Sequence, residues 1–141
     1  MIRKYNNQDE RRVIEIWLKS SSLAHPFLDS DFVEKVKKDM KKIYLPNAMT
    51  WVFEEDNIIT GFISMIGNEI GGLFVAPDHH SKGIGTKLVN FVRKDSKELE
   101  VEVFKENKIG RAFYDKYGFK KIKEYLHEET KQELIRMKFT G

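Results

Sequence analysis

The stretch LFVAPDHHSKGIGTKL, residues 73–88, decides the fold of this chain. It begins with a short apolar run that Pro77 ends, passes through a polar turn, and continues into a segment that starts with two glycines. Leu88, Phe91 and Val92 follow at i, i+3, i+4 spacing, so the predicted order is strand, loop, helix. A helix N-terminus has unpaired N–H groups and the positive end of the helix dipole, and glycines leave both accessible. The stretch therefore predicts a loop that binds a phosphate-bearing ligand.

Two common kinds of phosphate loop do not fit this stretch. A nucleoside triphosphate loop needs a Lys and a hydroxyl residue directly after its second glycine, whereas Lys82 stands before Gly83 here. A dinucleotide-binding loop needs a third glycine where Leu88 stands. The ligand is therefore expected to be of another phosphate-bearing class.

The loop resembles the acetyl-CoA loop of the GCN5-related N-acetyltransferase (GNAT) family. The matching pattern is His80-x-x-Gly83-x-Gly85. The family usually has Gln or Arg in the first position, so His80 departs from its pattern. Because backbone N–H groups do most of the binding in such a loop, a change of that side chain is tolerated.

A second stretch, from Asn107 to Phe119, resembles the family's other motif. An Asn at a helix start is followed by Ala112, the pair Phe113-Tyr114, and Gly118-Phe119. Two motifs in the family's order are far more specific than either one alone.

The resemblance implies acetyl-CoA as co-substrate, no metal, and a role for each matching residue. The backbone of the strand would pair with the pantetheine arm, the loop would hold the pyrophosphate, and Asn107 would hydrogen-bond the arm. The cofactor-binding residues expected in this way are Leu73, Phe74, Val75, His80, Ser81, Lys82, Gly83, Ile84, Gly85, Thr86 and Asn107.

Tyr114 is expected, by the same resemblance, to be the general acid that protonates the departing CoA thiolate. Helical spacing places Ile109, Phe113 and Tyr117 in one row, which we predict to be the core face. Tyr114 lies about 100° from Phe113 around the helix and is then free to face a cleft. A phenol of ordinary pKa near 10 suits a hydrogen-bonding acid for a leaving thiolate.

The general base and the acceptor pocket have weaker sequence signals. Glu69, just before the central strand, is the candidate base, because a carboxylate near that place serves in many family members. His25-Pro26-Phe27, between the first two helices, resembles an element that borders the acceptor pocket in small bacterial members, so His25 and Phe27 are candidate substrate-binding residues. Capping or packing of His25 remains an equal alternative.

Composition bounds the class of protein. With 141 residues and 40% hydrophobic content, we expect a single domain, residues 1–141, in the cytoplasm, with neither a signal peptide nor a membrane span. The net charge of +3 comes from 25 basic and 22 acidic residues that are mixed along the chain, which does not favour nucleic acid as a partner. The lysines between Lys35 and Lys42 are interpreted as the solvent-exposed face of a helix whose apolar stripe is Val36, Met40 and Ile43. The chain has no Cys, and Asp78-His79-His80 lacks a third ligand at metal-binding spacing.

Hydrophobic periodicity predicts the order β-α-α-β-β-β-α-β-α-β-β across the chain. The predicted strands are 1–5, 51–53, 58–65, 73–75, 99–103, 120–127 and 133–139. Helices are predicted after a capping box at Asn7 and Glu10, from Asp29 or Ser30 to Tyr44 with Pro46 as the stop, after Gly83, and after Asn107. This order predicts an α/β class with a mixed (α+β) sheet and helices on its faces. It also matches the GNAT acyl-CoA acyltransferase fold, which implies splayed central strands.

The functional expectation is an acetyl-CoA-dependent N-acetyltransferase that transfers an acetyl group to a primary amine by direct attack in a ternary complex. One alternative is a protein Lys or N-terminal acetyltransferase, so the acceptor is either an amine-bearing small molecule or a protein amine. A second alternative is a non-catalytic CoA-binding regulatory module. The oligomeric state, monomer or homodimer, is left open.

Overall fold

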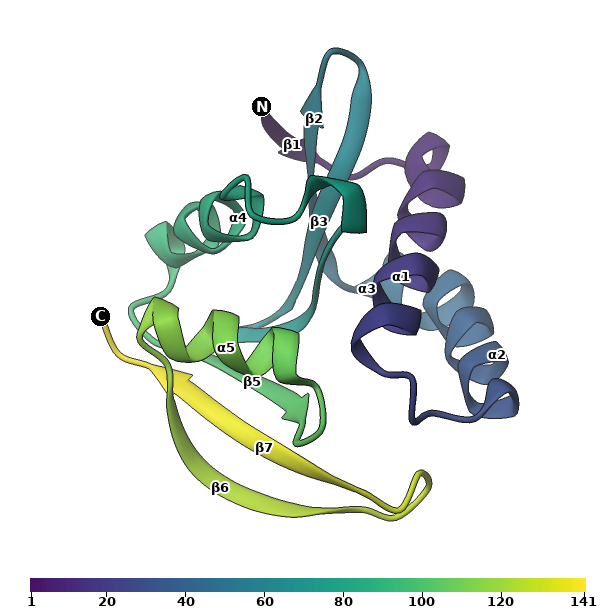
Figure 1. The fold of residues 1–141 in the computed structure, drawn as a ribbon. Coiled ribbons are helices and arrows are strands. Elements are labelled where there is room, and N and C mark those ends of the chain that lie inside the picture. The colour runs from purple at the N-terminus through teal and green to yellow at the C-terminus, as the bar shows by residue number, and fades with distance from the viewer.

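The computed structural model describes residues 1–141 as a seven-stranded mixed sheet in the order β1-β2-β3-β4-β5-β7-β6 (Figure 1). Only the β4–β5 pair is parallel, and every other pair is antiparallel. The strands are β1 (Ile2–Lys4), β2 (Met49–Glu55), β3 (Ile58–Ile66), β4 (Glu69–Val75), β5 (Leu99–Phe104), β6 (Lys120–His127) and β7 (Gln132–Phe139). The mixed sheet and the element order predicted from periodicity are confirmed.

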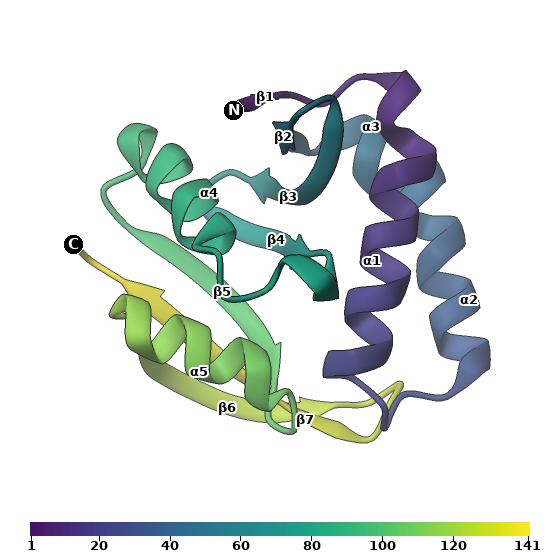
Figure 2. The same ribbon diagram turned by 45° about the horizontal axis from the view of Figure 1, so that its top comes forward.

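Helices cover both faces of the sheet (Figures 1 and 2). The first pair lies on one face and α4 and α5 lie on the other. The helices are α1 (Glu10–Ala24), α2 (Ser30–Asp39), the single turn α3 (Leu45–Asn47), α4 (Ile84–Val92) and α5 (Lys108–Tyr117). None of them has the length and apolar character that crossing a lipid bilayer requires.

The sheet splits between its two central strands. β4 and β5 are paired only at Glu69 with Glu100 and at Ile70 with Val101, after which each strand continues without the other. The splayed central strands expected of the fold are therefore present. The gap exposes one edge of β4 in the middle of the molecule.

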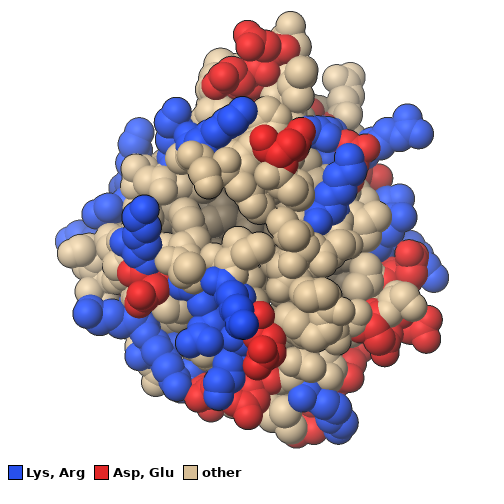
Figure 3. Space-filling view, viewed as in Figure 1, with Lys and Arg blue, Asp and Glu red and all other residues tan.

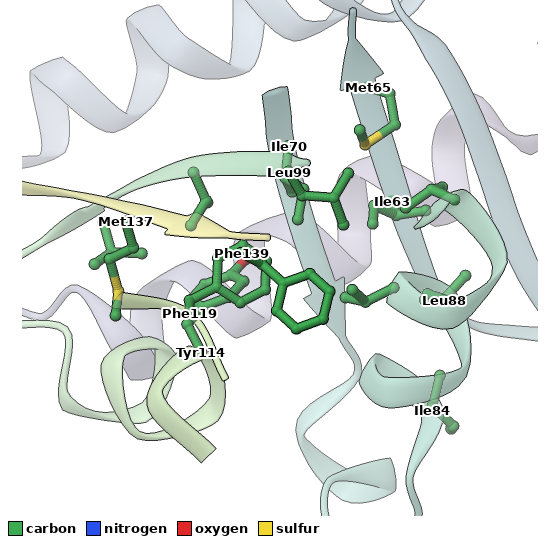
Figure 4. Close-up of a cluster of buried hydrophobic side chains, with 14 of the residues drawn as sticks. Ile63, Met65, Ile70, Ile84, Leu88, Leu99, Tyr114, Phe119, Met137 and Phe139 are labelled. Atoms are coloured by element: carbon green, nitrogen blue, oxygen red, sulfur yellow. The ribbon is translucent and has the colours of Figure 1, made fainter. Parts of the chain in front are cut away.

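Two apolar cores hold the layers together. The larger core joins α4 and α5 to the sheet, with Leu88, Leu99 and Phe119 fully buried in it (Figure 4). The smaller core joins α1 and α2 to the opposite face through Val13, Trp17 and Phe62, among others. The two cores lie on opposite faces of the split sheet.

The predicted core face of α5 is wrong in part. Ile109 is 45% exposed, whereas Tyr114 is only 5% exposed and lies inside the larger core beside Phe119 (Figure 4). Phe113 and Tyr117 are half-buried and pack at the margin of the core. The face of α5 that carries Tyr114 packs into the larger core and is the deepest, so the row of Ile109, Phe113 and Tyr117 is not the core face.

The first helix is capped one residue earlier than predicted. Asn6 and Asp9 form the capping box, and they start a short 3-10 turn that leads into α1. Asp9 is also held by Arg3 of β1 at 2.8 Å, so its side chain serves both the cap and an ion pair.

The end of the second predicted helix also differs. Residues Met40–Tyr44 form a π-helical turn, and the wider turn rotates Ile43 out of the predicted apolar stripe to 52% exposure. Pro46 does not end the helical region. It stands in the first turn of α3, where a missing N–H is tolerated.

Candidate active site

The loop between β4 and α4 presents a row of unpaired backbone donors. No backbone N–H from Ser81 to Thr86 donates a hydrogen bond within the loop, and α4 has no side-chain cap. Gly83 stands at the N-cap with φ of 79°, a left-handed conformation that an L side chain rarely adopts. This helix start has the free N–H groups and the positive dipole end that favour an anion, and the predicted phosphate-binding role of the loop stays a prediction.

Two glycines of this region allow close packing. A Cβ on Gly85 would lie 3.1 Å from the Phe113 ring, and a Cβ on Gly61 would lie 3.0 Å from the Ile84 side chain. These contacts fix α4 against α5 and against β3. The loop is therefore held by its neighbours on two sides.

The exposed edge of β4 offers further backbone groups. Ala76 N–H donates to the Thr60 carbonyl of the neighbouring strand at 2.8 Å. Because the direction of backbone groups alternates along a strand, Phe74 also faces β3, whereas Leu73 and Val75 face the gap. The backbone groups of Leu73 and the N–H of Val75 can then pair with a ligand in the gap, whereas the Val75 carbonyl already accepts from Ser20 Oγ and His80 Nε2, each at 2.8 Å.

A large cavity of about 810 Å³ joins the loop, β4 and α5, and we name it the loop-side cavity. Figure 3 shows a hollow between α4 and α5, walled by uncharged residues with Lys and Arg side chains around it. The sequence-predicted residues that line this cavity are Leu73, Val75, His80, Ser81, Gly83, Ile84, Gly85, Thr86 and Tyr114.

A second cavity, of about 250 Å³, opens on the α1 side of the split, and we name it the connector-side cavity. Its walls are mostly apolar, with contributions from Trp17 of α1, Phe32 of α2 and Phe104 of β5. The sequence-predicted residues in its lining are His25, Leu73, Phe74, Asn107 and Tyr114. Leu73 and Tyr114 therefore belong to the lining of both cavities.

Tyr114 is positioned by packing rather than by hydrogen bonds to its side chain. Its ring makes edge contacts with Phe113 and Phe119 at centroid distances of 5.2 and 5.1 Å. Burial raises the pKa of its hydroxyl, and no neighbouring charge contributes to the shift. The hydroxyl consequently stays protonated at neutral pH, as a proton donor must.

Several predicted residues lie elsewhere than expected. The Phe74 side chain belongs to the connector-side cavity and packs on Phe62, with ring centroids 5.6 Å apart. Lys82 is exposed, with its Nζ 3.5 Å from His79 Nδ1, and lines neither cavity. The Phe27 ring contacts the rings of His25 and Phe104 and lines neither cavity.

His80 and Asn107 have side chains that are already engaged. His80 donates its Nε2–H to the Val75 carbonyl at 2.8 Å, which ties the loop back to the end of β4. The Asn107 side-chain oxygen accepts from Gly110 N–H at 2.9 Å as the cap of α5, and its nitrogen lies 3.0 Å from His25 Nε2. The Asn107 side chain thus caps α5 and lies against His25, and its expected contact with a pantetheine arm stays a prediction.

Glu69, the candidate base, lies apart from Tyr114. It lines a third cavity of about 280 Å³ and is bound to Arg136 at 2.8 Å. The residue that sequence reasoning missed is Glu102, the only acidic residue in the lining of the connector-side cavity. The signal for it was the alternation Glu100-Val101-Glu102-Val103, which puts both glutamates on the face opposite to the larger core.

Glu100 and Glu102 both contact Arg136. Arg136 donates to Glu100 at 2.7 Å and lies 3.4 Å from Glu102. With Glu69 as its third partner, Arg136 cannot neutralise all three carboxylates, and its most distant partner is Glu102. This face of the site therefore has an excess of negative charge.

The split sheet, the loop with free N–H groups and the tyrosine shared by two cavities are the features that the sequence led us to expect of a GNAT acyltransferase. Comparison with known proteins agrees. Residues 46–121 match the model of the acetyltransferase (GNAT) domain. The chain belongs to the GNAT family and is an N-acetyltransferase.

Individual relatives give the same result. The chain is 33% identical over 120 residues to the peptidyl-lysine N-acetyltransferase YiaC of Escherichia coli, which covers 84% of this chain and 82% of YiaC. The solution structure of apo YjaB from Escherichia coli superimposes with a TM-score of 0.89 at 26% identity, over 100% of this chain and 97% of that one. The PaiA N-acetyltransferase of Thermoplasma acidophilum, solved in complex with coenzyme A, shares the fold with a TM-score of 0.81 at 22% identity, over 99% and 98% of the two chains.

Proposed function

We propose that this chain, acting as one domain over residues 1–141, transfers the acetyl group of acetyl-CoA directly to a primary amine, with Tyr114 as general acid. The observation that carries the proposal is that Leu73 and Tyr114 line both the loop-side and the connector-side cavities. A thioester in one cavity and an amine in the other would meet at these two residues. No covalent enzyme intermediate is needed, and the chain has no Cys to form a thioester of its own.

The loop-side cavity is proposed to hold the cofactor. The free N–H groups from Ser81 to Thr86 suit a pyrophosphate, and the gap-facing backbone of Leu73, together with the Val75 N–H, suits the amide groups of a pantetheine arm. Family neighbours solved with coenzyme A support this choice.

The connector-side cavity is proposed to hold the acceptor. Its apolar wall suits an aliphatic stem, and Glu102 suits an ammonium group at the end of that stem. The lysine side chain has this chemistry. Because the relatives YiaC and YjaB are named peptidyl-lysine N-acetyltransferases, we favour protein lysine as the acceptor over a small-molecule amine or an N-terminal amine.

The residues would then share the chemistry as follows. Glu102 orients the ammonium and accepts its proton, directly or through water, so that the neutral amine can attack. A gap-facing N–H of β4 donates to the carbonyl oxygen as negative charge develops there, in a place with little water. Tyr114 donates its hydroxyl proton to the sulfur as the carbon–sulfur bond breaks.

The test is Tyr114→Phe, measured as CoA release with acetyl-CoA and a panel of lysine peptides and small amines. Loss of a general acid lowers kcat by about a hundredfold, while the Michaelis constant for acetyl-CoA should change less than about threefold, because only a transition-state contact is removed. Tyr125→Phe, on the outer strand β6, is the control for loss of a phenol elsewhere. An unchanged kcat in Tyr114→Phe rules out the general acid.

A further inference from the structure

His25 lies where the connector between α1 and α2 meets the start of α5. Its Nδ1 is 3.0 Å from Ser21 Oγ, and its Nε2 is 3.0 Å from Asn107 Nδ2. The ring also makes edge contacts with Phe27 and Phe104, at 5.7 and 5.2 Å between centroids. Polar contacts at both nitrogens and aromatic contacts on the ring hold His25 in one orientation.

The direction of each hydrogen bond follows from the Asn107 cap. Gly110 N–H can only donate, so the Asn107 atom that receives it at 2.9 Å is the side-chain oxygen. The Asn107 nitrogen then faces His25, and an amide nitrogen can only donate. His25 Nε2 is therefore an acceptor, and the proton of the neutral ring is on Nδ1, where it is donated to Ser21 Oγ.

The surroundings of His25 favour this neutral form. Burial lowers the pKa of His25 to about 4. The titratable side chains that line the same cavity are Glu102 and Tyr114, and neither is hydrogen-bonded to the ring. Both ring nitrogens are engaged, so His25 has no free lone pair to act as the base for an incoming amine.

We propose that His25 is a positioning residue, which holds the Asn107 amide and so fixes the helix that carries Tyr114 against the connector. The proposal rests on the function proposed above for Tyr114. A chain of hydrogen bonds runs from Ser21 of α1 through His25 and Asn107 to Gly110 of α5, and so spans the split between the two halves of the sheet. Tyr114 lies about two helical turns beyond Asn107, so a loose first turn of α5 displaces its hydroxyl.

The first experiment needs no activity and is independent of the proposed function. Nitrogen-resolved NMR of the histidine side chains, with His25→Gln used to assign the His25 signal, gives the position of the ring proton. We expect the proton on Nδ1 and no titration of His25 between pH 5 and 8. A proton on Nε2, or titration within that range, overturns the proposal.

The second experiment compares two replacements of His25. Gln keeps an acceptor near the place of Nε2, whereas Leu keeps none. In His25→Leu, kcat should fall about tenfold and amide exchange at Gly110 should become faster, with little change in the Michaelis constant for acetyl-CoA. His25→Gln should restore most of both. His127→Gln is the matched control, because His127 contacts the same Phe104 ring at 5.9 Å but bonds to Thr130 instead of Asn107.

A double-variant cycle completes the test. Asn107→Ser keeps a cap for α5 but has no donor that reaches His25. If His25 acts through Asn107, His25→Leu should cost nothing further in the Asn107→Ser background. Additive losses, or a raised Michaelis constant for the amine at unchanged kcat, would show that His25 contacts substrate instead and would overturn the proposal. If His25→Leu does not fold, the NMR result and His25→Gln test the proposal. His25→Gln should then keep near wild-type kcat and amide exchange at Gly110.

Discussion

The substitution Gly83→Ala isolates the contribution of backbone conformation to cofactor binding. Gly83 has φ of 79°, and a Cβ built there meets no atom within 4 Å. The added methyl group therefore causes no clash, and the whole effect is the strain of a left-handed conformation. Gly67, in the turn between β3 and β4, has φ of 62° and the same open surroundings, so Gly67→Ala is a matched control away from the loop.

The size of the effect can be estimated from this geometry. Left-handed strain costs roughly 1–2 kcal/mol for a residue with a Cβ. The smaller entropy of the unfolded chain offsets about 0.4–1 kcal/mol of it, equally at both positions. If the loop of Gly83→Ala keeps the left-handed conformation without ligand, the strain lowers the free energy of unfolding. If the loop relaxes without ligand, the strain must be restored on binding and lowers the affinity for CoA. The two losses should therefore sum to about 1–2 kcal/mol before that offset, and a full loss of affinity would be about 5- to 30-fold.

The assay measures both quantities on the same variants. Urea unfolding gives the free energy of unfolding without ligand, and calorimetry gives the dissociation constants of CoA and of pantetheine. Gly67→Ala should lose stability only. Gly83→Ala should lose stability, affinity for CoA, or part of each, and should keep its affinity for pantetheine, which lacks the pyrophosphate. Unchanged stability and unchanged CoA affinity in Gly83→Ala would refute the left-handed loop, and an equal loss for pantetheine would refute the pyrophosphate site.

Two further predictions concern the acceptor side. Glu102→Gln should lower kcat/KM for the amine about tenfold and shift the pH profile of kcat/KM. Glu69→Gln, which also removes a partner of Arg136, should leave that pH profile unchanged. The reverse result would identify Glu69 as the general base. The second concerns pH. The folded pKa of His25, about 4, lies below the unfolded value near 6.5, so the unfolded chain binds more protons between these limits and stability falls as pH falls through them. From pH 7 to 4.5 the free energy of unfolding should drop by about 2 kcal/mol more in the wild type than in His25→Gln, and equal drops would contradict a buried neutral His25.

Periodicity and turn chemistry sufficed for the order of elements. Most strands have an alternation or an apolar run, and Pro77, Gly83 and Gly118 mark boundaries through their own backbone preferences. Details that depend on neighbours were harder to predict. The burial of Tyr114 depends on the larger core that packs against α5, and the π turn at residues 40–44 lies against the smaller core, which holds Met40. Neither partner can be located from a local pattern.

The site was predictable to the extent that it is made of backbone. The loop from His80 to Thr86 needs only its glycines and its position before a helix, and both are visible in the sequence. The side-chain contacts were not predictable, because each joins distant segments: His25 with Asn107, and Arg136 with Glu69 and Glu102. Glu69 and Glu102 look alike in the sequence, and only their different cavities distinguish them.

This difference between backbone and side chains bears on how the two halves of the site can vary. On the proposed function, the cofactor is held by N–H groups of the loop and of β4, so the residue in the first loop position is free to take another task. His80 does so here, since it donates to the Val75 carbonyl and holds the end of the strand whose backbone faces the gap. The acceptor, in contrast, is met by side chains such as Glu102, and a single substitution there alters the charge that an incoming amine encounters. Cofactor choice should therefore resist mutation in this fold, while acceptor choice should change with one or two residues of the connector-side cavity.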